Sequence, residues 1–236
     1  MRRYGLGFFL GMVALAAHGR VLDFHSDIRL APSGEVTVTE RITAQTEQGA
    51  YTLVRDLPPG AKVVDVVRNG HPVTHVIEGD RLRVGGPVPA GRYFYQLTYR
   101  VPRAVRFMGG LDELRWTVKG SGLAVERLTA EVTLPARVPP RDIRTESTLR
   151  EHQSFVRDGR AAFRTLRPLD AQEPMVIAVR FPKDVVAAPS FGQQARWLAA
   201  DYAGLLAVAI GLGLTAWTLV HIRKLSARTS ARTPRY

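Results

Sequence analysis

An alternation of apolar and polar residues with a period of two runs through the middle of the chain and constrains its fold more than any other feature. Segments 93–101, 114–118, 128–134 and 175–181 each place apolar side chains at every second position. Successive side chains of a β-strand point to opposite faces of a sheet, so each segment is predicted to be a strand with one buried face. No helical periodicity interrupts this series, and we therefore expect an all-β domain.

Turn residues separate these segments at short intervals. Asn69-Gly70 and Asp158-Gly159 lie between apolar runs, as in two-residue β-hairpins, while Ser33-Gly34, Gly79-Asp80 and Gly85-Gly86 mark further reversals. Many short strands at this spacing are typical of an antiparallel β-sandwich, with a barrel as the alternative. We assign this domain to residues 20–182.

The N-terminal segment has the pattern of a secretory signal. Arg2 and Arg3 precede an apolar run from Gly5 to Ala17, which is too short to span a bilayer well and ends among small residues. A signal peptide is therefore predicted over residues 1–19, and the domain that follows it is expected to be exported.

A second apolar run, from Tyr202 to Val220, contains no charged residue. At about 1.5 Å per residue a helix of this length covers about 28 Å, close to the thickness of the hydrocarbon core. We predict a linker over residues 183–200, a transmembrane helix over 201–221 and a basic cytoplasmic tail over 222–236. The positive-inside rule then places the β domain outside the cytoplasm, in the periplasm.

Small residues recur at every fourth position of this apolar run, at Ala207, Gly211 and Thr215. Such a stripe lets two membrane helices approach closely, although it is also common by chance in spans rich in alanine and glycine. Weak self-association through the membrane helix is therefore kept as an alternative.

The composition narrows the functions open to the domain. The formal net charge is +12, and much of it comes from the two ends, which carry Arg2, Arg3, Arg223, Lys224, Arg228, Arg232 and Arg235. Basicity of this kind indicates membrane orientation and not nucleic-acid binding. The chain has no cysteine, so disulfides, thiolate catalysis and cysteine-based metal sites are excluded.

Three segments in order along the chain resemble a known family. They are residues 21–28 (VLDFHSDI) with 34–42 (GEVTVTERI), residues 54–58 (VRDLP), and residues 107–120, which end in DELRWTVKG. This pattern is similar to the YciQ-like predicted membrane proteins, whose exported N-terminal domain is catalogued as domain of unknown function 2207. The resemblance implies the same exported and membrane-anchored architecture, and it implies no active site.

Other motifs suggest catalytic chemistry only at first sight. His71 and His75 are four residues apart on a predicted strand, which separates them by about 13 Å at about 3.3 Å per residue, too far to share one metal ion. Asp112 and Glu113 are neighbours on a strand and point to opposite faces, so we interpret them as a solvated acidic edge. Gly120-Ser121-Gly122 lacks the strand-to-helix context of a nucleophile elbow. No catalytic residue, metal or cofactor is predicted.

Glu40 breaks the pattern of its strand. It shares a face with Val36, Val38 and Ile42, and that face should be buried. A buried carboxylate needs a partner, because an isolated charge in the core costs several kcal/mol. We expect a structural ion pair with Arg55, on a nearby strand-like segment that could lie beside the strand of Glu40. The alternatives are a β-bulge that turns Glu40 out to solvent and a role for Glu40 as a general acid.

Two classes of function remain open. A non-enzymatic envelope module that binds an unknown envelope protein or glycan, or that assembles a membrane complex, is favoured because no catalytic set of residues appears in the sequence. The alternative is an envelope hydrolase whose site is assembled from distant loops. We expect no enzymatic activity and no nucleic-acid partner.

Overall fold

The computed structural model describes residues 19–46, 51–119, 122 and 124–199, together with residues 202, 208, 211, 212, 214, 215, 217 and 218. Apart from Gly19, the predicted signal peptide lies outside these residues, as do the predicted basic tail and most of the predicted transmembrane helix. Among the residues that are described, no helix is both long enough and apolar enough to cross a membrane.

The chain divides into two compact units, Met1–Ala188 and Pro189–Tyr236. In the second unit a helix covers residues 191–199. Ser190 caps this helix: its Oγ accepts a hydrogen bond from Gln193 N at 3.3 Å, and the Gln193 side chain accepts one from Ser190 N at 3.0 Å. This reciprocal arrangement is a capping box, and it explains where the helix begins.

The first unit consists of strands with one short 3-10 helix, η1 (Pro140–Asp142). In chain order the strands are β1 (Gly19–Leu30), β2 (Val36–Thr46), β3 (Tyr51–Asp56), β4 (Lys62–Arg68), β5 (His71–Pro72), β6 (His75–Glu78), β7 (Arg81–Val88), β8 (Gly91–Val101), β9 (Val105–Phe107), β10 (Asp112–Lys119), β11 (Val125–Thr133), β12 (Arg144–Ser147), β13 (His152–Arg157), β14 (Arg160–Thr165) and β15 (Met175–Phe181).

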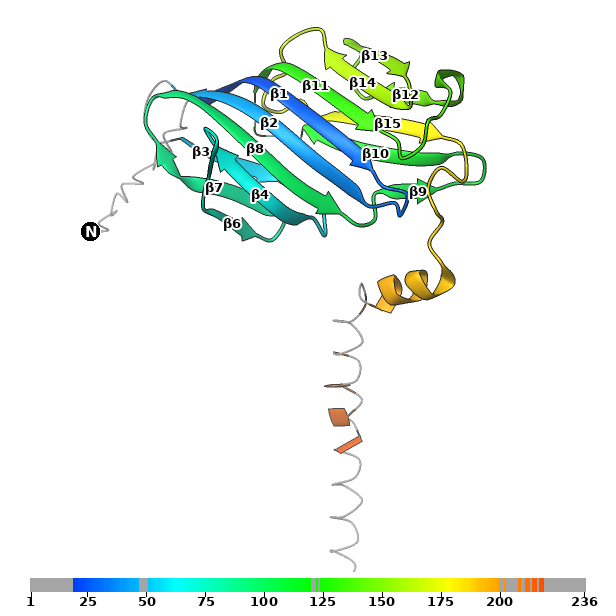
Figure 1. Cartoon of the computed structure of the whole chain (residues 1–236). Coiled ribbons are helices and arrows are strands. Elements are labelled where there is room, and N and C mark those ends of the chain that lie inside the picture. The colour runs from blue at the N-terminus through cyan, green and yellow to red at the C-terminus, as the bar shows by residue number, and fades with distance from the viewer. Residues whose placement is uncertain are drawn as a thin grey trace, which may run out of the picture. The chain divides into compact units, whose positions relative to one another are not determined.

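Three sheets are formed from these strands (Figure 1). The largest has eight strands in the order β13-β14-β11-β1-β2-β8-β4-β5, and the others have the orders β12-β15-β10-β9 and β3-β7-β6. The domain is therefore mostly β, as predicted, and its sheets do not close into a barrel. The pairing is not wholly antiparallel, because β1 runs parallel to β11, with Phe24 opposite Leu128.

The two smaller sheets pack against one face of the eight-stranded sheet. Tyr99 on β8 stacks on Trp116 of β10, with ring centroids 6.5 Å apart, and both side chains are buried. Apolar side chains that alternate along the strands fill the space between these layers, as the period of two predicts. Most side chains on the opposite face of the large sheet are polar and at least partly exposed, and we call it the outer face.

Both predicted two-residue hairpin turns are present. Asn69 and Gly70 have φ angles of 52° and 81°, and Asp158 and Gly159 have φ angles of 50° and 74°. Positive φ at both central residues is what a type I′ turn requires, and asparagine, aspartate and glycine tolerate it best. The second of these turns positions the candidate site.

Candidate binding site

The β13–β14 hairpin holds the loop that follows β11 against its turn. A Cβ atom on Gly159 would lie 3.0 Å from the carbonyl oxygen of Ala136, which is tighter than most contacts of a Cβ atom, and the Gly159 carbonyl accepts a hydrogen bond from Leu134 N at 3.0 Å. Glycine therefore permits both the positive φ and the close approach of the loop. This contact brings Arg137 beside the hairpin.

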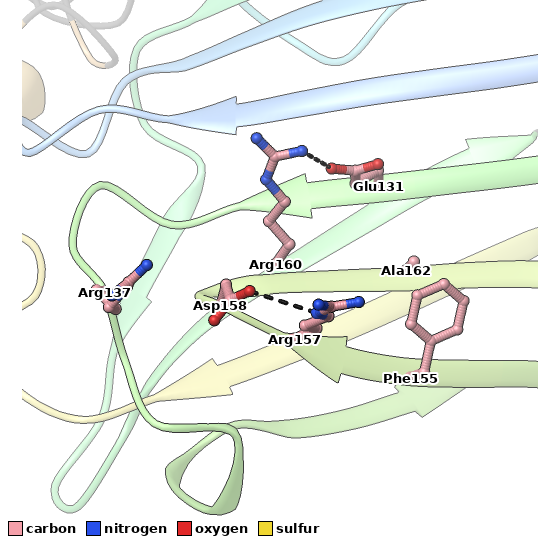
Figure 2. Close-up of a pocket in the computed structure, with 7 residues that line it drawn as sticks. All are labelled: Glu131, Arg137, Phe155, Arg157, Asp158, Arg160 and Ala162. Carbon is pink, nitrogen blue, oxygen red and sulfur yellow. Dashed lines mark hydrogen bonds and ion pairs between the residues drawn. The ribbon is translucent and has the colours of Figure 1, made fainter.

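A row of outward-facing side chains crosses three strands at this end of the large sheet. Phe155 of β13 lies opposite Ala162 of β14, and Ala162 lies opposite Glu131 of β11. The small alanine side chain leaves space between its larger neighbours, and a cavity of about 510 Å³ opens there on the outer face (Figure 2). We call this cavity the arginine hollow; its lining residues are Glu131, Arg137, Phe155, Arg157, Asp158, Arg160 and Ala162.

The charges in the arginine hollow do not balance. Arg157 and Arg160 occupy directly opposite positions of the hairpin, and like charges in such a pair destabilise it. Each has one carboxylate neighbour: Arg157 Nε lies 3.4 Å from Asp158, and Arg160 Nη1 lies 3.0 Å from Glu131. Arg137 has no ion-pair partner within the described part of the chain, and Figure 2 draws it without a contact. The hollow thus holds three guanidinium groups and two carboxylates.

This arrangement is suited to binding an anion. Guanidinium groups bind carboxylates and phosphates through paired N–H donors. The side chains of Arg157 and Arg160 are 86% and 62% exposed, so both can reach a ligand. Phe155, 61% exposed, adds an apolar surface beside these charges.

Sequence reasoning missed the arginine hollow, although one signal for it was available. In a two-residue hairpin the residues that flank the turn face each other, so Arg157-Asp158-Gly159-Arg160 already implies two opposed arginines. The contributions of Glu131 and Arg137 come from β11 and its loop, and no local pattern connects these to the hairpin.

Glu40 and Arg55 meet in the buried space between the layers. Arg55 Nε donates to Glu40 Oε2 at 2.8 Å and Arg55 Nη2 donates to Oε1 at 2.9 Å. The Tyr99 hydroxyl donates to the same Oε1 at 2.7 Å. Two further guanidinium N–H groups donate to the backbone carbonyls of Asp56 and Val118, at 3.0 and 2.9 Å. Both carboxylate oxygens of Glu40 and all three guanidinium nitrogens of Arg55 thus have hydrogen-bond partners, as a buried pair requires.

The environment of this pair changes the acidity of its neighbours. Burial lowers the pKa of Arg55, but the adjacent Glu40 carboxylate outweighs that effect and raises the pKa above its ordinary value. Burial, together with the negative charge of Glu40, also holds the pKa of Tyr99 well above its usual range. Arg55 thus remains a cation and Tyr99 a neutral donor, which suits a structural role for the network.

The route by which these residues meet differs from the expected one. β3, which carries Arg55, pairs with β7 in the three-stranded sheet and not with β2. Arg55 therefore reaches Glu40 across the interior from the facing layer, and does not lie beside it in the same sheet.

The interpretation of Asp112 and Glu113 as a solvated edge is wrong. Their exposed fractions are only 1% and 3%. Asp112 forms an ion pair with Lys183, and Glu113 accepts a hydrogen bond from Arg180 Nε at 2.8 Å. Neighbouring residues do point to opposite faces of a strand, but each of these carboxylates is covered by a cation from a segment more than 60 residues away.

His71 and His75 lie on separate strands, β5 and β6, and both are exposed. Among the described residues no group of three or more histidine, cysteine, aspartate or glutamate side chains could hold a metal ion. Of the glycine-serine motif at 120–122, only Gly122 belongs to the described part of the chain.

A family model described as "Predicted membrane protein (DUF2207) N-terminal domain" matches residues 20–181. The chain belongs to the DUF2207 family. The match confirms the resemblance recognised from the three sequence segments and identifies a domain of unknown function from predicted membrane proteins. No curated protein matches this DUF2207 chain.

Solved structures similar to this DUF2207 domain are parts of larger proteins. Native yeast LTA4 hydrolase aligns with a TM-score of 0.51 at 13% identity, over 69% of this chain and 29% of that one. The M1 zinc metallopeptidase from Deinococcus radiodurans aligns with a TM-score of 0.44 at 14% identity, over 68% of this chain and 42% of that one. The chain thus spans less than half the length of either protein, and at such identities the yeast match shows a shared fold alone.

Proposed function

We propose that this protein is a membrane-anchored, non-enzymatic binding module of the cell envelope, which binds an acidic surface of a protein partner through the arginine hollow. The observation that carries the proposal is the opposed pair Arg157 and Arg160. Opposed cations lower the stability of a hairpin. An anionic partner placed between them would remove this repulsion.

The lining of the arginine hollow favours a protein as the partner. Arginine and aromatic residues are enriched at the energetic centres of protein interfaces. Here Phe155 stands 61% exposed beside the guanidinium groups, so one partner residue could contact the ring while a neighbouring carboxylate contacts the arginines. An acidic envelope glycan offers the same charge and is the second candidate.

The proposed topology places a β-sandwich domain outside the membrane and one helix, over residues 201–221, within it. Membership of a family of predicted membrane proteins supports this placement, and the uncharged run from Tyr202 to Val220 provides the span. Alkaline phosphatase fused near Ser190 should be active, and the same enzyme fused after Tyr236 should be inactive. The reverse pattern would exclude this topology.

Site-specific crosslinking tests the binding proposal. A photoreactive phenylalanine analogue replaces Phe155 in the full-length protein, and Phe94, which is 56% exposed elsewhere on the outer face, serves as the matched position. Irradiation of native membranes should give a discrete protein adduct from position 155 and none from 94. The adduct should disappear in Arg137→Glu and Arg157→Glu backgrounds and persist with Arg150→Glu, a charge reversal in the exposed turn before β13.

Adducts of equal yield from both positions, or an adduct insensitive to charge reversal in the hollow, would refute the binding proposal. Purified protein that hydrolyses an envelope polymer, with loss of turnover in the Arg137→Glu variant, would favour the hydrolase instead.

A further inference from the structure

In the second layer, the described residues leave one edge of β3 and part of one edge of β10 without a neighbouring strand. β3 pairs with β7 on one side only. β10 pairs with β15 along most of its length, but on its other side β9 reaches only as far as Leu114. The open part of β10 therefore follows Leu114, and Ala104, the residue before β9, lies at its start opposite Arg115.

The direction of the backbone groups on this open part follows from the neighbouring strands. Thr148 N donates to the carbonyl of Val176 at 3.0 Å, so the backbone of Val176 on β15 is turned toward the β12 side and away from β10. Thr117 is the cross-strand partner of Val176. In an antiparallel ladder the two members of a pair either both face each other or both face away. The N–H and C=O of Thr117 therefore point to the open edge, as do those of Arg115, two residues earlier.

A groove of about 530 Å³ lies along this open edge. Arg115, Trp116 and Thr117 line one side, and its other lining residues include Asp56 and Leu57, at and just beyond the end of β3. Beyond the groove a side-chain contact joins the two strands, because Arg55 Nη2 donates to the Val118 carbonyl at 2.9 Å. The groove thus lies between β10 and the end of β3.

The charge of the groove favours an acidic occupant. Arg115, which lines the groove, is exposed and has no ion-pair partner among the residues described. Of the acidic residues, only Asp56 contributes to the lining, and it is already paired with Arg81 at 3.0 Å.

We propose that an extended acidic segment of a partner protein adds a strand to β10 in this groove, hydrogen-bonding the backbone of Arg115 and Thr117. Strand addition at an exposed edge takes its affinity from main-chain hydrogen bonds and its selectivity from alternate side chains. The acidic side chains of the added strand would face Arg115 on the outside, and its apolar side chains would face Trp116. This site is separate from the arginine hollow, which lies on the eight-stranded sheet.

The probe for this proposal is a blocked eight-residue peptide of alternating glutamate and valine, added to the full-length protein in detergent. Hydrogen exchange should slow at the amides of Arg115 and Thr117 and remain unchanged on the outer face. A peptide N-methylated on the amides of one edge should bind roughly tenfold more weakly or worse, because its main-chain donors are lost. A lysine-valine peptide should bind about as poorly, because its charge is reversed.

Arg115→Glu should reverse these preferences: the glutamate peptide should bind more weakly and the lysine peptide more tightly. Arg41→Glu is the matched control: Arg41 is an exposed arginine in the middle of β2, on the opposite layer, and its reversal should change neither affinity. The peptide experiments on the unmodified protein stand even if Arg115→Glu fails to fold. Absence of protection at Arg115 and Thr117, equal binding of the N-methylated peptide, or protection that arises from dimerisation of the chain without peptide would overturn the proposal.

Discussion

Two arginine clusters in this domain use the same side chain in opposite ways. Arg55 lies between the layers with a carboxylate, a tyrosine hydroxyl and two backbone carbonyls around it. Arg157 and Arg160 face each other on an exposed hairpin with one carboxylate contact each. The first cluster is complete without any ligand, whereas the second keeps cationic donors available for one.

This difference indicates on which of the two clusters the stability of the folded domain should depend. Removing one member of a buried pair leaves an uncompensated charge in the core and is costly. Removing one of two opposed cations on the surface relieves repulsion and costs little. Substitutions in the two clusters should therefore move stability in opposite directions.

The largest effect is expected for Glu40→Ala, which should lower the free energy of unfolding by about 3–5 kcal/mol because Arg55 and Tyr99 both lose their buried partner. Adding Arg55→Met should recover much of the loss, since the unpaired cation is removed with its partner. Denaturant unfolding of the full-length protein, monitored by circular dichroism, gives the free energy of unfolding of the unmodified protein, each single variant and the double variant. Strictly additive losses would mean that the two residues do not stabilise each other.

An intermediate effect is expected for Tyr99→Phe, which should cost about 2 kcal/mol at neutral pH by removing a hydrogen bond to a charged group. The raised pKa of Tyr99 means that the folded chain keeps this proton longer than the unfolded chain. The stabilisation that the Tyr99 hydroxyl provides is therefore fully present below about pH 10, the pKa of tyrosine in the unfolded chain. It is lost as the pH rises further. Between pH 8 and 11 the free energy of unfolding should fall less steeply for Tyr99→Phe than for the half-buried control Tyr93→Phe. Equal slopes would contradict this role.

The smallest effect, and the only one of opposite sign, is expected for Arg157→Thr. Removing one of the opposed cations should raise the free energy of unfolding by about 0.2–1 kcal/mol. The matched control is Arg164→Thr on the same hairpin, because Arg164 lies opposite the neutral Gln153 and donates to it at 2.8 Å. Thermal unfolding should separate the two variants. A loss of stability in Arg157→Thr as large as in the control would show that repulsion is not significant there.

The sequence predicted those parts of the fold that depend on local chemistry. Alternation over 93–101 and 175–181 corresponds to β8 and β15, and Asp158-Gly159 forms the expected turn. The parallel pairing of β1 with β11 was not predicted, because alternation records which face of a strand is buried and not the direction of its neighbour.

The candidate site was less accessible to sequence reasoning for a related reason. Glu40 stood out because it interrupted an apolar face, and that interruption required a cation. Exposed arginines do not interrupt an apolar pattern in the sequence. Arg137 could therefore be placed beside Arg157 only once the contact between Gly159 and Ala136 was known. The burial of Asp112 was missed because its cation, Lys183, lies on a segment with no strand pattern.

The parallel pairing of β1 and β11 has a consequence for how the chain acquires its structure. His25 hydrogen-bonds Thr129 across this pair, 104 positions along the chain. At a synthesis rate of about 5–20 residues per second, that interval corresponds to roughly 5–20 s during which one edge of β1 has no neighbour. Contacts so distant in sequence also slow folding, since a long loop must close before they form. The newly made chain therefore passes through a period of vulnerability to misassociation, and a chaperone that shields a strand edge would be most useful in that period.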